Sequence, residues 1–242
     1  MHTLAYNKEL KLLQFSIICC SNDMDEANRK LLSSPDINNH DLQVIFDPET
    51  IPKGYNQGLK EATGEYIIFV HHDVILPQGF FVNLEKQIDN LKDKDWGVIG
   101  PAGVDKRDFY GNIYDACKHS GDPSKLPHDV DTLDEFLFVI KRDTLTFDEN
   151  LPSKNHFHCA DLCMQSRSEG LSVISVDVYC LHLTSHLNDG KKGESYKKAY
   201  FYMQDKWRSF LPFRTTTIMV TEEESLKFYP RINCLCMNPK EQ

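Results

Sequence analysis

Polar side chains that bind metals or exchange protons follow the apolar runs of this sequence, at the point where each run ends. The runs are short and continuous, which is typical of buried strands. In open α/β sheets ligands bind beyond the carboxyl ends of the strands, so we expect these side chains to gather at one edge. Carboxylates and imidazoles there could hold a divalent cation, and hydroxyls and amides could bind a polar ligand. The residues are Ser21, Asn22, Asp47, His71, His72, Asp73 and His182.

The elements that must position these residues alternate between strand and helix. Residues 15–20 (FSIICC), 42–47 (LQVIFD), 65–73 (EYIIFVHHD) and 96–100 (WGVIG) predict strands. Helix-compatible stretches separate them, and apolar residues recur with helical spacing through residues 79–92. This alternation predicts an α/β, Rossmann-like fold with a mostly parallel sheet and helices on both faces.

The second half of the chain is less regular. Residues 101–131 are rich in Gly, Pro, Asp and Lys, which predicts a long connection that could act as a lid. Residues 136–141 and 171–183 predict strands, and residues 160–170 predict a helix. A further helix carries a stripe that Pro212 ends, and helical spacing of this kind indicates core packing. The stripe consists of Tyr196, Tyr200, Met203, Trp207 and Phe210.

Composition excludes several classes of protein. The 242 residues include 27 Lys and Arg against 36 Asp and Glu, a net charge of −9 that repels nucleic acid, so we predict no nucleic-acid partner. No apolar run approaches the roughly 20 residues that span a bilayer, and residues 1–14 do not resemble a signal peptide. We therefore expect no transmembrane segment.

Most cysteines lie in apolar runs, which favours free thiols in a reducing, cytoplasmic compartment. They are Cys19, Cys20, Cys117, Cys159, Cys163, Cys180, Cys234 and Cys236.

The stretch GYNQGLKEATGEYIIFVHHDVILPQGFF resembles the family 2 glycosyltransferases, which have the GT-A fold. That family has an Asn-x-Gly helix, an Ala-x-Gly-Glu-Tyr motif, an apolar strand and a metal-binding Asp-x-Asp. Here Asn56, residues 62–66 and Asp73 stand in register with those motifs, and His71 replaces the first aspartate, as in a His-x-Asp subset of the family. SIICCSND upstream and FDENLPSKNHFHCADLCMQSRSEG downstream extend the resemblance to roughly residues 14–212.

The resemblance implies an inverting glycosyltransferase of the hexosyltransferase type, with a nucleotide-sugar donor such as a UDP-sugar and a hydroxyl acceptor. The diphosphate leaving group gains negative charge, which a divalent cation neutralises. Asp73 would be the carboxylate ligand of that cation and His182 a nitrogen ligand, a mixture that suits Mn²⁺, with Mg²⁺ as the alternative. Asp161, in the first turn of a helix, would take the proton of the acceptor. The nucleotide would lie against Ser21, Asn22, Asp47, Asn56, His71 and His72.

The resemblance also implies a domain organisation. We expect a single GT-A domain over residues 1–212, with a nucleotide-binding half at about 12–100 and an acceptor and catalytic half at about 101–212. Residues 213–242 would be a C-terminal extension that packs on the domain. The acceptor could be a carbohydrate, a lipid-linked molecule or a protein, so polysaccharide, lipopolysaccharide and glycoprotein synthesis all stay open. A lipid-linked acceptor would bring the chain to the inner face of a membrane.

Three alternatives use some of the same residues. A nucleotidyl pyrophosphorylase would have a Gly-rich basic loop after the first strand, where this chain has CCSNDMDE. A GT-A-like module could bind a nucleotide or glycan without transferring sugar, and its binding would not depend on metal. A structural zinc site would need paired ligands at standard spacing, which the candidates lack. Those candidates are His156, His158, Cys159, Cys163, Cys180 and His182.

Overall fold

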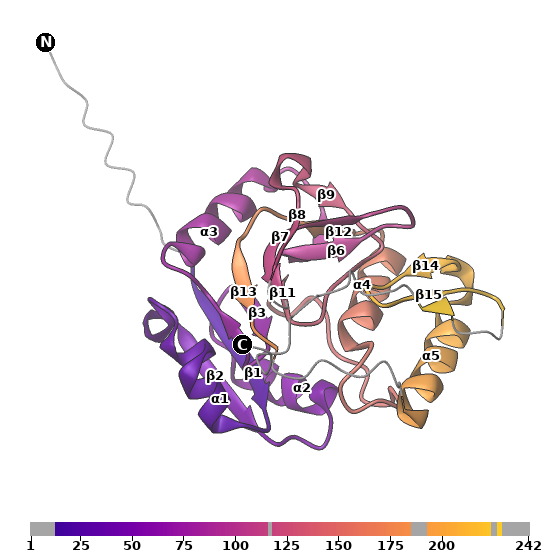
Figure 1. Cartoon of the computed structure of the whole chain (residues 1–242), viewed down its shortest axis with the longest axis horizontal. Coiled ribbons are helices and arrows are strands. Elements are labelled where there is room, and N and C mark those ends of the chain that lie inside the picture. Colours follow the sequence, from indigo (N-terminus) through magenta and orange to yellow (C-terminus); the bar gives the residue numbers. More distant parts are fainter. Residues whose placement is uncertain (1–12, 116–117, 185–192, 224–226, 229–242) are drawn as a thin grey trace, which may run out of the picture.

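The computed structural model describes residues 13–115, 118–184, 193–223 and 227–228 (Figure 1). Single 3-10 turns lie at Leu31–Ser33, Ile37–Asn39, Pro123–Lys125 and Arg208–Phe210. The predictions for the first twelve residues, for Cys117, Cys234 and Cys236, and for the end of the C-terminal extension fall outside the described residues.

A seven-stranded sheet with the order β2-β1-β3-β11-β5-β12-β9 forms the centre of the molecule. β1 (Phe15–Ser21) lies between β2 (Asp41–Phe46) and β3 (Tyr66–Val70), and both pairings are parallel. All seven residues of β1 are buried, which explains why its sequence is a continuous apolar run rather than an alternating one. The predicted α/β class and the first three strands are confirmed.

The other half of this sheet mixes strand directions. β5 (Trp96–Gly100) and β12 (Ser172–Ser175) pair in parallel. β11 (Leu137–Lys141) runs antiparallel to both β3 and β5, and β9 (His128–Asp129) runs antiparallel to β12. The sheet is therefore mixed rather than mostly parallel. Direction was not readable from the sequence, because an apolar strand between two neighbours looks the same either way.

Helices cover both faces of the sheet, as predicted. α3 (Phe80–Asn90) packs on the face to which Ile17 and Cys19 point. α2 (Ile51–Glu61) and α4 (His158–Ser168) pack on the opposite face, in the core that contains Ile18. Alternate side chains of β1 thus serve two separate cores. The short helix α1 (Met24–Arg29) begins at Asp23, whose side chain accepts a hydrogen bond from the Glu26 amide.

A second sheet, which the sequence did not predict, is formed largely by residues 101–131. Its order is β10-β6-β7-β13-β4, with β8 (Lys118–Gly121) paired to β7. The expectation of an irregular connection is wrong. Strands of two or three residues are too short to show an alternating pattern, and Gly111 and Asn112 interrupt the longer β7. The remaining strands are β4 (Val74–Ile75), β6 (Ala102–Val104), β7 (Phe109–Asp115), β10 (Thr132–Leu133) and β13 (Cys180–His182).

Two predicted strands are shorter than expected. Residues 171–183 divide into β12 in the first sheet and β13 in the second. The predicted strand 65–73 ends as β3 at Val70, and residues 71–73 form a turn that leads into β4. Each break lies where the chain leaves the central sheet for the smaller one. It brings the ends of β3 and β13 and the start of β4 into one region.

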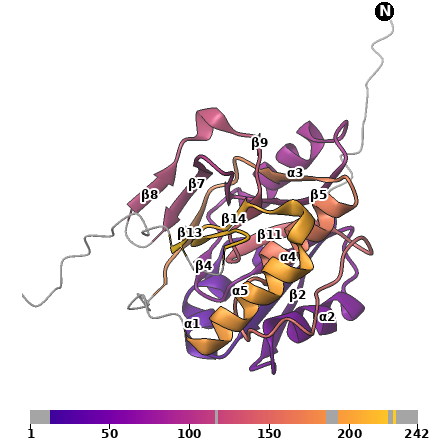
Figure 2. The same cartoon turned by 90° about the vertical axis from the view of Figure 1, so that its right-hand side faces the viewer.

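The C-terminal elements pack against α4 (Figures 1 and 2). They are α5 (Glu194–Lys206), β14 (Phe213–Arg214) and β15 (Ile218–Val220), and β16 (Lys227–Phe228) pairs with β15 to complete a three-stranded sheet. The predicted aromatic stripe is confirmed as core, because four of its members are buried and Phe210 packs against the same cluster. No helix among the described residues has both the length and the apolar character needed to cross a bilayer.

Candidate active site

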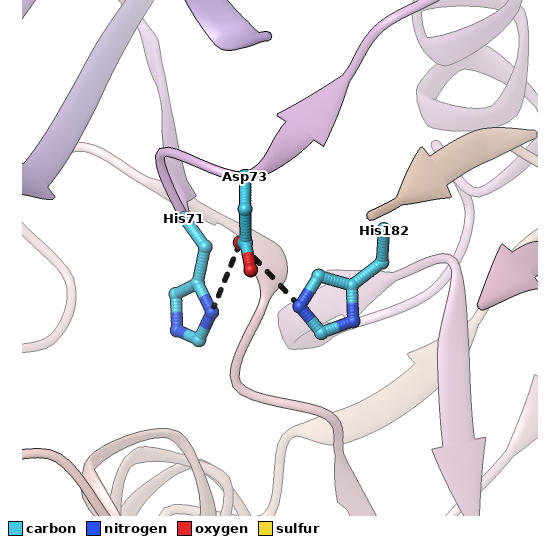
Figure 3. A group of neighbouring side chains, drawn as sticks. All are labelled: His71, Asp73 and His182. Atoms are coloured by element: carbon cyan, nitrogen blue, oxygen red, sulfur yellow. Dashed lines mark ion pairs between the residues drawn. The ribbon is translucent and has the colours of Figure 1, made fainter. Parts of the chain in front are cut away.

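Three side chains that could hold a metal ion meet where β3, β4 and β13 come together (Figure 3). Asp73 Oδ1 lies 3.9 Å from His71 Nδ1 and 3.5 Å from His182 Nε2, and the ligand atoms of the three residues lie within 4.8 Å of one another. Asp73 Oδ1 is buried and has no hydrogen-bond partner. A buried carboxylate oxygen that accepts no hydrogen bond and lies between two imidazoles fits a divalent cation such as Mn²⁺.

Neighbouring residues fix the orientation of His182. Its Nδ1 lies 2.9 Å from Asp115 Oδ1, and the Phe136 ring stacks on it at 4.7 Å between centroids with 15° between planes. A carboxylate that accepts from one imidazole nitrogen directs the other nitrogen towards a metal. Here that second nitrogen, Nε2, is the atom that faces Asp73. Asp115 therefore orients His182 for the role predicted for it.

The pKa values of the three residues are shifted by burial and by their close contacts with one another. Burial opposes the charge of His182, but its hydrogen bond to Asp115 and the nearby Asp73 carboxylate outweigh burial and raise its pKa to about 9. Burial also opposes the charge of Asp73, yet His182 and then His71 hold its pKa well below the usual range. The pKa of His71 falls to about 3, mainly because of burial. Asp73 is thus an anion, and a metal ion would displace a proton from His182.

Two cavities open on either side of Asp73. The first has a volume of about 210 Å³ and brings together four of the residues predicted to bind nucleotide, Asn22, Asp47, His71 and His72. Lys154 also lines it, with Nζ 3.2 Å from Asp47 Oδ1, and places a positive charge in this cavity.

The second cavity also has a volume of about 210 Å³, and its lining is polar. Its side chains include three acidic residues, His156, Tyr196 and four threonines. The first cavity shares His71, Asp73 and Asn155 with it. The candidate metal-binding group therefore lies at the junction between the two cavities. The remaining polar lining residues are Asp134, Glu135, His182, Thr184, Thr215, Thr216 and Thr217.

Two residues predicted to bind nucleotide do not line either cavity. Ser21 is buried, and its Oγ lies 2.7 Å from His72 Nδ1, so it positions a residue of the first cavity. Asn56 on α2 donates to the Phe147 carbonyl and accepts from the Phe147 amide, both at 2.9 Å. This side chain therefore fastens α2 to the segment that precedes α4.

Asp161, predicted to be the general base, is also outside both cavities. It is 1 % exposed, and its oxygens accept from Trp207 Nε1 at 2.8 Å and Gln165 Nε2 at 3.0 Å. Lys206 Nζ forms an ion pair with it at 2.8 Å. Three donors thus enclose this carboxylate, and the role of Asp161 as the base stays a prediction.

Comparison with known proteins agrees with this geometry. A family model described as the glycosyltransferase like family matches residues 16–204. The chain belongs to this family. A curated relative from Fuscovulum blasticum, "ATP synthase subunits region ORF 6", is 26% identical over 169 residues, which is 66% of this chain and 66% of the relative. The predicted resemblance to glycosyltransferases is therefore confirmed.

Solved structures of GT-A glycosyltransferases share the fold. S. aureus TarS 1-349 matches with a TM-score of 0.52 at 15% identity, over 80% of this chain and 65% of that one. The mannosyltransferase PcManGT from Pyrobaculum calidifontis, in complex with GDP-Man and Mn2+, matches with a TM-score of 0.50 at 15% identity, over 81% and 71%. The family member described here thus spans about two thirds of the length of TarS 1-349 and of the curated relative.

Several residues of this candidate site were not predicted. Asp134 and Glu135 precede β11, and the prediction considered only residues that follow strands. Because β11 runs antiparallel to β3, its first residues lie beside the last residues of β3, and the His71 amide donates to the Phe136 carbonyl at 2.8 Å. The feature of the sequence that could have indicated Asp134 and Glu135 is their position as an acidic pair directly before an apolar run.

The side chains considered for zinc are divided among different parts of the molecule. Cys159 and Cys163 face each other at 4.0 Å between sulfurs in one core, and Cys180 belongs to the other core. Among the described residues, His71, Asp73 and His182 are the group of three whose ligand atoms lie close enough to share a metal.

Proposed function

We propose that the chain transfers a sugar, with inversion, from a nucleoside-diphosphate donor to a hydroxyl group, and that it uses a divalent metal ion, Mn²⁺ or Mg²⁺. One observation carries this proposal. The His71, Asp73 and His182 group lies at the junction of two cavities that share His71, Asp73 and Asn155. A diphosphate bound there would have its nucleoside in one cavity and its sugar in the other.

The first cavity suits the nucleoside. Asn22 and Asp47 offer polar groups for a base and ribose, and Lys154 offers positive charge in a protein that is acidic as a whole. TarS 1-349 has been solved with UDP-GlcNAc and PcManGT with GDP-Man and Mn2+, which supports a nucleotide-sugar donor here. We propose a UDP-sugar as the donor, as the sequence resemblance implies.

The metal-binding group would act on the diphosphate, and the second cavity would bind the donor sugar and the acceptor. When bound, the metal ion supplies positive charge that stabilises the diphosphate as it leaves. Asp73 and the two imidazoles would hold the ion, and Asp115 keeps His182 in orientation. The hydroxyl-rich lining of the second cavity could hydrogen-bond the hydroxyls of the donor sugar and of a carbohydrate, lipid-linked or protein acceptor.

The biological setting follows from these assignments as a further part of the proposal. Synthesis of a polysaccharide or another glycan would consume the product of such a transfer. The described cysteines are buried free thiols, which supports the expected reducing, cytoplasmic compartment. A lipid-linked acceptor would place the reaction at the inner face of a membrane.

Titration calorimetry tests the metal-dependent donor site. We expect UDP to bind at least tenfold more tightly with Mn²⁺ than with a chelator. Asp73→Asn should remove that difference, because an amide lacks the negative charge that binds the metal. Asp89→Asn, at the exposed end of α3 and away from both cavities, is the matched control and should retain the difference. Equal UDP affinities with and without Mn²⁺ in the wild-type chain would contradict the metal assignment.

The same measurements separate transfer from simple binding. A binding module would take up UDP without metal dependence and would release no UDP from any nucleotide sugar. An enzyme should release UDP from the donor that binds, either to an acceptor or slowly to water. Binding with no turnover of any donor in a panel would favour the module.

A further inference from the structure

A transfer to a hydroxyl needs a group that takes the proton, and that group must line the cavity where the hydroxyl binds. Asp161 does not meet this requirement, because it is enclosed by Trp207, Gln165 and Lys206. The second cavity contains an imidazole beside a carboxylate, His156 and Glu135. This pair lies in the same cavity as Asp73, on segments distant in sequence from the three residues proposed to hold the metal.

The position of His156 suits proton transfer. Its side chain is 34% exposed, and its Nδ1 lies 3.6 Å from Glu135 Oε2. Its ring and the Tyr196 ring lie nearly perpendicular, with 5.2 Å between centroids. Because Nδ1 of His156 faces Glu135, Nε2 is the ring nitrogen of His156 that is available to a substrate. Such hydrogen bonds are often long in the absence of substrate and shorten in its presence.

The backbone around His156 is held in an uncommon conformation. Phe157 has φ of 69°, in the left-handed region that a bulky residue rarely adopts, and the Ser153 hydroxyl accepts from the His156 amide at 3.1 Å. The two histidines that flank Phe157 consequently lie on different sides of Glu135. His156 lines the cavity, and His158 is fully buried with Nδ1 3.6 Å from Glu135 Oε1.

Glu135 is kept as an anion by these two rings. Burial favours its neutral form, but attraction to His158 and His156 outweighs burial and lowers its pKa to about 2. A carboxylate that stays ionised can accept a hydrogen bond from Nδ1 of His156 and stabilise the ring when it becomes positively charged. His156 lines the cavity with an imidazole that can accept a proton, and the Glu135 carboxylate lies behind that ring.

We propose that His156 is the catalytic base and that Glu135 is its positioning residue, an inference that rests on the proposed sugar transfer. The acceptor O–H bond breaks and its proton moves to His156 Nε2. The acceptor oxygen forms a bond to the anomeric carbon on the face opposite the diphosphate. The bond from that carbon to the diphosphate oxygen breaks, and its electron pair leaves with the nucleoside diphosphate.

The test compares His156→Gln with His119→Gln, a control on the exposed side of β8 that lines neither cavity. UDP release from UDP-GlcNAc, or from GDP-mannose if that donor binds instead, is followed in Mn²⁺ with water as the acceptor. We expect His156→Gln to lower kcat by 10²–10⁴-fold while donor affinity changes less than threefold. His119→Gln should retain the wild-type rate.

The pH profile adds a signature that a structural role would not produce. The titratable groups that face His156 are Glu135 from the segment before β11, Tyr196 from α5 and His158 from its own segment. We expect the acid limb of kcat to disappear in His156→Gln. In Glu135→Gln it should move to lower pH, because the charged imidazole loses its anionic partner. His156→Ala provides a second variant, whose rate should recover partly when free imidazole is added.

The outcomes distinguish this inference from the proposed function. A wild-type rate and acid limb in His156→Gln would overturn the assignment of the base and leave sugar transfer intact. Loss of donor affinity with an unchanged kcat would instead make His156 a donor-binding residue and would equally overturn it. A wild-type chain that binds donor and Mn²⁺ but turns over none of the panel would overturn the proposed function, and the base with it.

Discussion

At the scale of single residues, the buried Asp161 carboxylate stabilises the joint between α4 and the end of α5. Asp161→Asn places an amide next to the Lys206 ammonium, which lies 2.8 Å from the carboxylate. Because one partner of a largely buried ion pair loses its charge, we expect a loss of roughly 2–4 kcal/mol in the free energy of unfolding. The rate of sugar transfer per folded molecule should stay near wild type. Urea unfolding and steady-state kinetics measure the two effects.

Asp205→Asn is the control for this prediction. Asp205 also lies on α5 and pairs with Arg208 at 3.0 Å, but its side chain is 81% exposed. Exposed pairs contribute little, so the change should cost less than about 0.5 kcal/mol. A large fall in kcat with unchanged stability in Asp161→Asn would return Asp161 to the role of base that the family resemblance implied.

The sequence allowed part of the candidate site to be predicted, and the reason is topological. Asn22, Asp47 and Asp73 follow strands that run in the same direction, so their common edge was foreseeable. Glu135 and His156 could not be assigned in this way. The first precedes an antiparallel strand, and the second lies in a loop whose path depends on the left-handed Phe157.

At the scale of elements, Gly64 fixes the distance between β1 and the start of β3. A Cβ atom at this position would lie 2.4 Å from the Ser16 amide nitrogen and 2.6 Å from the Phe15 carbonyl carbon. These are backbone atoms of a central strand, so they cannot move without disturbing its pairing. We expect Gly64→Ala to lower the free energy of unfolding by roughly 2–3 kcal/mol, measured by urea denaturation.

Gly193→Ala is the matched control for Gly64. A Cβ atom at Gly193 has no neighbour within 4 Å, so the change removes the same backbone freedom without a clash. It should alter stability by less than about 1 kcal/mol. Equal effects of the two alanines would show that β1 and β3 tolerate more separation than their close approach indicates.

Asp148 joins α5 to the segment between β11 and α4. Its Oδ2 lies 2.6 Å from both Lys206 Nζ and the Tyr202 hydroxyl. Burial raises the pKa of Asp148, but these two partners outweigh burial and lower it from 3.8 to about 2. A depressed pKa stabilises the folded state above the pKa of the unfolded chain, and the stabilisation disappears as pH falls through the folded-state value.

Asp148→Asn should therefore cost about 1 kcal/mol above pH 5, an amount that allows for screening by solvent. The difference from wild type should shrink between about pH 4 and pH 2, where the wild-type carboxylate takes up its proton. Urea unfolding at a series of pH values gives both quantities. Asp143→Asn, at a side chain that is 87% exposed, should show no such trend. A difference that is constant down to pH 2 would mean that the ion pair contributes nothing to stability.

Elements were predictable where burial gives a long pattern and unpredictable where strands are short. β1, β5 and α3 coincide with their predicted spans to within one or two residues, because each has an uninterrupted apolar run or a helical repeat. β6 and β10 have three and two residues, so only pairing with β7 and with each other defines them. A pattern within one segment cannot contain information that depends on a distant partner.

At the scale of the whole molecule, the candidate site depends on segments from most of the chain. The first cavity is lined by residues from Cys20 to Asn155, and the second extends to Thr217 in the turn between β14 and β15. The C-terminal elements share a core with α4, so they support the second cavity as well as closing it. A ligand that fills both cavities would therefore contact both sheets and the C-terminal elements at once.

This arrangement predicts that a nucleotide sugar with Mn²⁺ stabilises the entire fold. A ligand at about 100 times its dissociation constant adds roughly 2.7 kcal/mol if it binds only the folded state, which corresponds to a rise of about 5–10 °C in Tm for a chain of this size. We expect UDP-sugars with Mn²⁺ to produce such a rise in thermal unfolding, and UDP-sugars with a chelator to produce much less.

A panel of nucleotide sugars then identifies the donor, because in the proposed arrangement the first cavity would select the base and the second would select the sugar. Asp73→Asn should lose the metal-dependent part of the rise, whereas Asp89→Asn should retain it. A rise that is largest with GDP-sugars would replace the UDP assignment but keep the metal-dependent site. If the rise in Tm is the same for every nucleotide, with and without Mn²⁺, then neither cavity distinguishes donors. In that case Asp73 does not hold a metal ion between the two cavities.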